Sequence, residues 1–124
     1  NKMERHGSGD EIRDYIHVFD AAKACVSILD EKFKNKYVML KGSQTIKIKD
    51  LMKMIKEIIN KNIKIKFLPQ INEEHYEITP YSFRPRTALK YIADTQMDLG
   101  EGVLDTVYEV YKKIHGKEFK KPKK

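Results

Sequence analysis

The chain has 124 residues, a net charge of +7 at pH 7, and is 40% hydrophobic and 35% charged. This length allows one domain with a modest core and excludes a complete two-domain enzyme, while the composition excludes disorder throughout. No apolar stretch reaches the roughly 20 residues of a membrane span and nothing resembles a signal peptide, so we expect a cytoplasmic protein that does not bind membranes.

The first part of the chain alternates between strand and helix patterns. β-forming residues alternate over 12–18, which predicts a strand, and Asp20 is expected to cap a helix that continues to Leu29. Residues 36–41 contain an apolar run ended by Gly42-Ser43, which predicts a buried strand followed by a turn.

A longer helix is predicted over residues 48–59, where apolar side chains follow the i, i+3, i+4, i+7 spacing and lysines occupy the opposite face. Residues 63–67 then alternate between apolar residues and lysine, which predicts a strand with one wet face. Pro69 ends that strand. Residues 70–87 are polar and interrupted by prolines, and we expect them to form a long loop with few ordered contacts.

The last part of the chain is predicted to be helical. Asp94 is expected to cap a short turn that runs to Leu99, and Gly100-Glu101-Gly102 is expected to separate this turn from a final helix over residues 103–114. Strands interleaved with helices predict a small α/β domain. The strands are too few for a full doubly wound sheet, and with the abrupt start at Asn1 they suggest a fragment of a larger enzyme.

The positive charge raises the question of nucleic-acid binding. Only four of the 25 basic residues are arginines, and the lysines mostly alternate with apolar residues along element faces, so solvated faces explain the charge and argue against a nucleic-acid partner. The predicted domain covers residues 1–118. Residues 119–124 form a basic tail to which we assign no function.

Two common catalytic patterns are absent or incomplete. Gly7-Ser8-Gly9 lacks the third glycine and the preceding strand of a phosphate-binding loop, so a hairpin turn is expected there. Tyrosine and lysine four residues apart, the spacing used by short-chain dehydrogenases, occur at Tyr37/Lys41 and Tyr108/Lys112. With 7 tyrosines in a lysine-rich chain, both pairs are interpreted as coincidences.

A metal site is not expected, because the four histidines have no ligand spacing and Cys25 has no second thiol to pair with. Cys25 is interpreted as buried packing in a reduced protein. His17, inside the first predicted strand, is interpreted as structural. His75, in the long loop, is a ligand-contact candidate without an assigned role.

Two segments carry a more specific signal. Residues 13–22 read Arg-Asp-Tyr-Ile-His-Val-Phe-Asp-Ala-Ala, and residues 84–87 read Arg-Pro-Arg-Thr, followed by Tyr-Ile-Ala-Asp-Thr at 91–95 and Leu99-Gly100. These segments and their intervals resemble the extended short-chain dehydrogenase/reductases, especially the NAD-dependent nucleotide-sugar epimerases and dehydratases of the UDP-glucose 4-epimerase type. Residues 35–51 resemble the strand, glycine turn and helix between them.

The resemblance implies that this chain is the small C-terminal substrate-binding domain of such an enzyme, without the Rossmann half that holds NAD. By resemblance, Arg13 and Arg84 are the two arginines that bind the diphosphate of a UDP-sugar or similar nucleotide sugar. Arg86 takes this role if the loop register shifts. Guanidinium groups suit it because they bind phosphate oxygens in pairs and stay charged. No catalytic or cofactor-binding residue falls within the chain.

Departures from the family pattern limit what is carried over. Thr87 stands where the family often has an acid that binds ribose, and the tryptophan-x-proline segment after the leucine-glycine step is missing. The resemblance does not separate epimerase, dehydratase and reductase. Two alternatives stay open, namely a non-catalytic binding module of the same fold and a basic nucleic-acid-binding domain.

Overall fold

The computed structural model describes residues 2–69 and 87–116. In chain order its elements are β1 (Lys2–His6), β2 (Ile12–Tyr15), α1 (Val18–Ser27), a 3₁₀ turn η1 (Glu31–Phe33), β3 (Val38–Leu40), β4 (Gln44–Lys47), α2 (Ile48–Ile59), β5 (Lys64–Leu68), β6 (Leu89–Tyr91) and α3 (Leu99–His115). These elements make a small α/β domain, as the sequence predicts.

The described strands form three separate two-stranded ladders, so no continuous sheet is present among them. β1 and β5 are parallel, with Lys2 opposite Lys64, and β3 and β6 are parallel, with Val38 opposite Leu89. β2 and β4 are antiparallel, and Arg13 lies opposite Ile46. Among the described residues, the strands do not form a doubly wound sheet.

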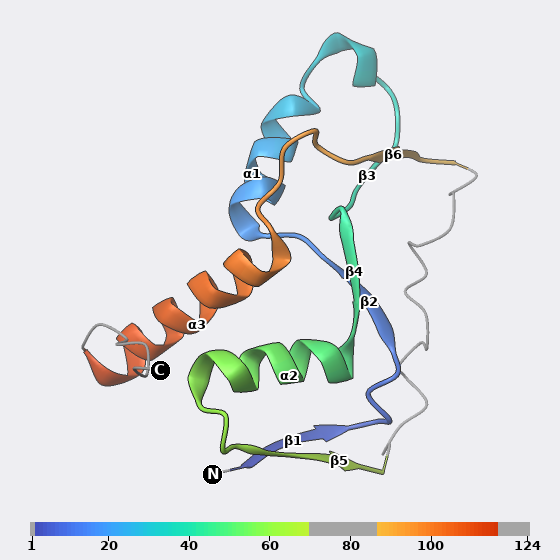
Figure 1. Ribbon diagram of the computed structural model, residues 1–124. Coiled ribbons are helices and arrows are strands. Elements are labelled where there is room, and N and C mark those ends of the chain that lie inside the picture. Colours follow the sequence, from blue (N-terminus) through green and yellow to red (C-terminus); the bar gives the residue numbers. More distant parts are fainter. Residues whose placement is uncertain (1, 70–86, 117–124) are drawn as a thin grey trace.

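The helices give the domain only a thin apolar core. α2 lies beside the β1/β5 ladder and contacts α3, while α1 and the β3/β6 ladder occupy the opposite end of the molecule (Figure 1). Within the described ranges, the buried hydrophobic residues are Ala24, Ile48, Met52 and Ile63. No helix in these ranges is long and apolar enough to cross a membrane.

Polar contacts from distant elements hold residues 96–99, which we call the α3 entry segment and which end at Leu99, the first residue of the helix. The Gln96 side chain accepts from the Ser43 N–H at 2.7 Å and donates to the Lys41 carbonyl at 3.1 Å. The Met97 N–H donates to Asp20 Oδ2 at 2.8 Å. The Gln44 side chain accepts from the Leu99 N–H at 2.7 Å and donates to Asp98. This segment therefore connects α1, β4 and α3.

An ion pair links β2 to the residue that follows β3. Lys41 Nζ lies 3.3 Å from Asp14 Oδ2, and the two side chains are only 14% and 6% exposed. Between them, Gly42 lies so close to the Tyr15 carbonyl that a side chain at position 42 would collide with backbone. The β2/β4 ladder and the end of β3 thus meet at a tightly packed polar contact.

Several sequence predictions are confirmed. The helix over 48–59 matches α2, the strand at 63–67 overlaps β5, and the last helix lies within α3. The strand at 12–18 is present but ends at Tyr15, because His17 caps α1, and the strand at 36–41 is present over Val38–Leu40. The predicted loop over 70–87 and the basic tail over 119–124 lie outside the described residues, apart from Thr87.

Two predicted caps are wrong. His17 caps α1, and Asp20 instead sits buried in its first turn, because its carboxylate is taken by the Met97 N–H. Residues 94–97 form no helical turn, and α3 is capped by Asp98 rather than preceded by a turn capped by Asp94. Gly100-Glu101-Gly102 consequently belongs to the first turn of α3 and separates nothing.

The interpretations of two other positions are also wrong. Gly7-Ser8-Gly9 does follow a strand, β1, and it makes no hairpin because β1 pairs with β5 and β2 with β4. Cys25 is exposed, because the inward face of α1 is formed by Asp20 and Ala24, one turn apart. Val26 and Leu29 are exposed as well, at 70% and 81%.

The cap at Asp98 predicts a pH-dependent contribution to stability. Its side chain accepts from Gly100 N–H at 2.8 Å and from Glu101 N–H at 3.3 Å, and the hydrogen bond from Gln44, followed by these backbone bonds, lowers the pKa of the carboxyl from its ordinary 3.8. A lowered folded pKa means that the stabilisation is present above about pH 4 and is lost as the pH falls through the folded value. Asp98→Ala should therefore lower the thermal midpoint at pH 7 more than at pH 2.5.

The control for this measurement is Asp94→Ala. Asp94 is exposed and precedes no helix, so its replacement should leave the melting curve unchanged at both pH values. Equal melting temperatures for Asp98→Ala and Asp94→Ala at pH 7 would contradict the assignment of the cap.

The Asp14–Lys41 pair predicts a second stability effect. Lys41→Met removes one partner of a buried ion pair and leaves Asp14 without its counter-charge, which costs about 3 kcal/mol of unfolding free energy. Replacing both residues, as Asp14→Leu with Lys41→Met, should recover most of that loss because no buried charge remains. Urea unfolding of the two variants measures the difference.

Lys53→Met is the matched control, because Lys53 pairs with Asp50 on the exposed side of α2. Such surface pairs contribute about 0–1 kcal/mol. The contradicting result is a double variant whose loss of unfolding free energy equals the sum of the losses in Asp14→Leu and Lys41→Met. The two charges would then not compensate each other.

Candidate functional site

Arg13, the first predicted diphosphate ligand, lies on β2, in the ladder that β2 forms with β4. Its side chain is partly buried and donates from Nη1 to the Ile12 carbonyl at 2.8 Å. This bond uses one N–H group of the guanidinium. The guanidinium carries further N–H donors that can reach a ligand. Asp14, the next residue, turns to the other face of the strand and pairs with Lys41.

Tyr15 and Arg5 are associated with Arg13. Tyr15 follows Arg13 by two residues and therefore shares its face of β2. Partial burial raises the pKa of the Tyr15 phenol above 10.0, and the positive charges of Arg13 and then Arg5 oppose the rise. The phenol consequently keeps its proton at neutral pH and can donate a hydrogen bond. Two guanidinium groups and one phenol are thus grouped near β2.

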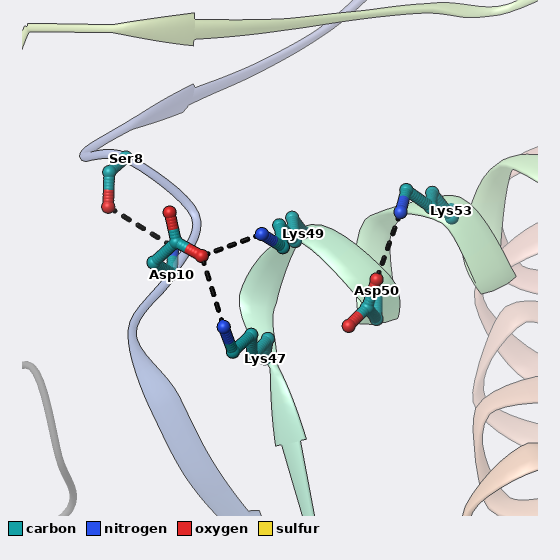
Figure 2. Close-up of polar contacts among 6 residues, drawn as sticks. All are labelled: Ser8, Asp10, Lys47, Lys49, Asp50 and Lys53. Carbon is teal, nitrogen blue, oxygen red and sulfur yellow. Dashed lines mark hydrogen bonds and ion pairs between the residues drawn. The ribbon is translucent and has the colours of Figure 1, made fainter.

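The two arginines differ from the lysines in how their charge is used. Among the residues that the structure describes, ion pairs are formed by lysines and by His17, and neither Arg5 nor Arg13 takes part in one. Figure 2 shows a typical lysine arrangement, in which Asp10 lies between Lys47 at 3.3 Å and Lys49 at 2.7 Å. Within the described ranges, the charges of Arg5 and Arg13 are therefore not matched by an ion pair with an acidic side chain.

His17 is structural, as its position in the sequence indicated. Its Nδ1 accepts from the Phe19 N–H at 3.4 Å at the start of α1, and its Nε2 lies 3.4 Å from Asp105 on α3. The ring is also packed against Gly102. Because both ring nitrogens are engaged, His17 joins α1 to α3 and is not placed to act as a base.

A pocket of about 260 Å³ begins at Tyr15 and runs between α2 and α3. Its wall is formed by the end of β2, the start of α1, the α3 entry segment and facing side chains of the two helices. Arg13 is not among the lining residues. Tyr15, which shares a face of β2 with Arg13, does line the pocket, so the pocket adjoins the arginine that is predicted to bind the diphosphate. Nothing in the sequence pointed to this pocket, since its lining comes from six stretches of the chain.

Other sequence-predicted site residues cannot be placed. Arg84, Arg86 and His75 lie outside the described residues, and the pairing of Arg84 with Arg13 stays a prediction. Thr87 is described and exposed. Arg5 was missed, and no local pattern marks it, because only the pairing of β1 with β5 fixes its position.

The described residues do not fit an NAD pyrophosphate. Gly7-Ser8-Gly9 leads into Asp10 and then strand β2, whereas a dinucleotide loop leads into a helix whose N-terminus holds the phosphates. Gly7 and Gly9 have positive φ values of 106° and 81°. The space where a Cβ would stand is occupied by the side chain of Glu11 at Gly7 and by that of Phe67 at Gly9. Within the described ranges, no group of three or more histidine, cysteine or acidic residues could hold a metal ion.

Comparison with known proteins gives a partial match. Over 53 residues the chain is 34% identical to GDP-L-fucose synthase 1 of Arabidopsis thaliana, and equally to putative GDP-L-fucose synthase 2 of the same plant. No model of a known protein family matches the chain, and no solved structure matches it. Each match covers 43% of this chain and 16% of the relative, so the matched part is about a sixth of those proteins. The chain is thus related in sequence to proteins of nucleotide-sugar metabolism over less than half of its length.

Proposed function

We propose that this chain is the substrate-binding part of a nucleotide-sugar epimerase or reductase and that Arg13 binds the diphosphate of the substrate. The observation that carries the proposal is Arg13 itself, a partly buried guanidinium on the same face of β2 as Tyr15 that forms no ion pair within the described ranges. Guanidinium groups bind phosphate oxygens through paired, charge-assisted hydrogen bonds. Arg84, or Arg86 in its place, supplies the second cation.

The sequence resemblance and the match to two GDP-L-fucose synthases support this proposal, because both point to a substrate that carries a nucleoside diphosphate. A clamp on the diphosphate converts binding energy from a remote group into orientation of the sugar. NAD or a related nicotinamide, held by a Rossmann domain of the parent enzyme, would supply the hydride chemistry. The residues of this chain bind and orient the substrate.

The rival proposal of a nucleic-acid-binding domain has less support. Asp10 pairs with both Lys47 and Lys49, and Asp50 pairs with Lys53 (Figure 2). The hydrogen bond from Lys49, then that from Lys47, lowers the pKa of Asp10, so this carboxylate stays ionised at neutral pH. A surface whose lysines are paired with acids in this way does not form the continuous cation track that a phosphate backbone requires.

The first test is binding of GDP and UDP by calorimetry. Arg13→Ala and Arg84→Ala should each remove charge-assisted bonds of about 1.5–3 kcal/mol, which corresponds to a roughly ten- to hundred-fold loss of affinity. Arg13→Lys should recover only part of it, because lysine keeps the charge without the paired geometry. All variants should melt like the parent chain.

Two controls accompany this test. Arg86→Ala should have a small effect unless it, and not Arg84, is the second ligand, and Lys53→Ala removes an equal charge from the far side of α2. Unchanged affinity in both Arg13→Ala and Arg84→Ala would overturn the diphosphate site. Unfolding of Arg13→Ala would give Arg13 a structural role.

A second test concerns catalysis. Because no nicotinamide site is found among the described residues, the chain supplied with NAD or NADP and with GDP- or UDP-sugars should show no turnover when sugar products are followed by chromatography. Reproducible turnover by the purified chain would contradict its assignment as a binding domain.

A further inference from the structure

The pocket between α2 and α3 has a lining that is unlike the arginine site beside it. Seven of its lining residues are apolar, contributed mainly by facing turns of the two helices, with Leu51 and Ile55 on α2 opposite Val103 and Val107 on α3. Each of these four side chains is only half-buried. Apolar surface that remains in contact with water at a concave site is stabilised when another apolar group covers it.

The polar side chains in the lining are largely occupied by the fold. Gln44 and Gln96 each use both ends of the amide to hold the α3 entry segment or the turn before β4. Asp20 accepts from Met97 N–H, and Asp98 caps α3. A ligand that formed hydrogen bonds with these side chains would have to break bonds that hold the fold. The lining therefore favours a ligand that binds through apolar contacts.

Thr106 and His17 are engaged in the same way. The Thr106 hydroxyl donates to the Gly102 carbonyl at 2.8 Å within α3, and His17 caps α1 while facing Asp105. Two exposed residues, Tyr15 and Ser43, contribute single hydroxyl groups. Among the residues that the structure describes, no lysine or arginine lines the pocket. Its chemistry therefore suits an uncharged group and not a phosphate.

The volume limits the size of this group. At about 260 Å³, the pocket is larger than the cavity of about 150 Å³ in which an engineered protein holds benzene, and smaller than the roughly 300–1,000 Å³ typical of drug-sized ligands. We propose that the pocket between α2 and α3 is a binding site for a neutral aromatic or aliphatic group of one or two rings. The pocket adjoins the diphosphate site at Tyr15, and this proposal does not rest on the diphosphate site.

Indole is a suitable probe, because it is neutral and apolar and has two fused rings. Its binding is followed by chemical-shift changes of backbone amides, which should be saturable, centred on α2 and α3, and described by one site of roughly millimolar Kd. Pyrophosphate, which should bind at Arg13, is expected to leave the indole affinity unchanged. Arg13→Ala should leave it unchanged as well, so a failure of the diphosphate site and a failure of this pocket give different results.

Val103→Trp fills the pocket with the same ring system that the probe carries. It should weaken indole binding by at least about tenfold, because the ring occupies the space that the probe needs. Val110→Trp is the matched control on the same helix, since Val110 is 50% exposed and does not line the pocket. The chain has no tryptophan of its own, so each variant contains a single reporter.

The fluorescence of these reporters shows whether the pocket has been filled. Emission of Val103→Trp should lie at shorter wavelength than that of Val110→Trp, because a ring inside the pocket is shielded from water. Two results would overturn the proposal. One is the absence of saturable indole binding up to the solubility limit of the probe, and the other is equal binding by Val103→Trp and the parent chain.

Discussion

The fold depends on polar contacts to the α3 entry segment. Gln96, Met97 and Leu99 receive or donate hydrogen bonds to partners 53 to 77 residues away in the chain. Hydrogen bonds usually contribute modestly to stability, but a buried polar group that loses its partner is costly. In a domain with so few buried apolar side chains, these contacts carry much of the specificity that a larger core would supply, because they fix where α1, β4 and α3 meet.

The same contacts arrange the candidate site. Asp20 and Gln44 both hold the α3 entry segment, and they flank the end of β2, on which Arg13 and Tyr15 lie. The antiparallel pairing of β2 with β4 sets the face to which these two side chains turn. Asp14 on the other face is fixed by Lys41. The arginine is thus positioned by its neighbours in the strand, and among the described residues its charge takes part in no ion pair.

Sequence patterns predicted the elements whose signal is local. The helical spacing over residues 48–59 and the alternation at 63–67 depend on nearby residues only, and both elements were found. β1, β4 and β6 were not predicted, because residues 2–6, 44–47 and 89–91 contain no apolar run or long alternation, and pairing with distant segments makes them strands. Asp20 was chosen as a cap by residue type alone, yet Met97, 77 residues away, decides its role. Arg13 was found through a ten-residue motif, whereas Arg5 and the pocket arise only when separate elements come together.

The charge of the chain is best understood through the difference between its lysines and its arginines. Lysine side chains are long and hydrated, and several of the described lysines pair with acids on exposed faces, where such pairs contribute little to stability. A net charge of +7 therefore says little about a partner by itself. What distinguishes Arg13 and Arg5 is their position beside a partly buried phenol, where water screens a charge less than at an open surface. An incoming phosphate would meet those two charges more strongly than it meets the lysines. The apolar pocket that begins at Tyr15 offers the opposite chemistry a short distance away.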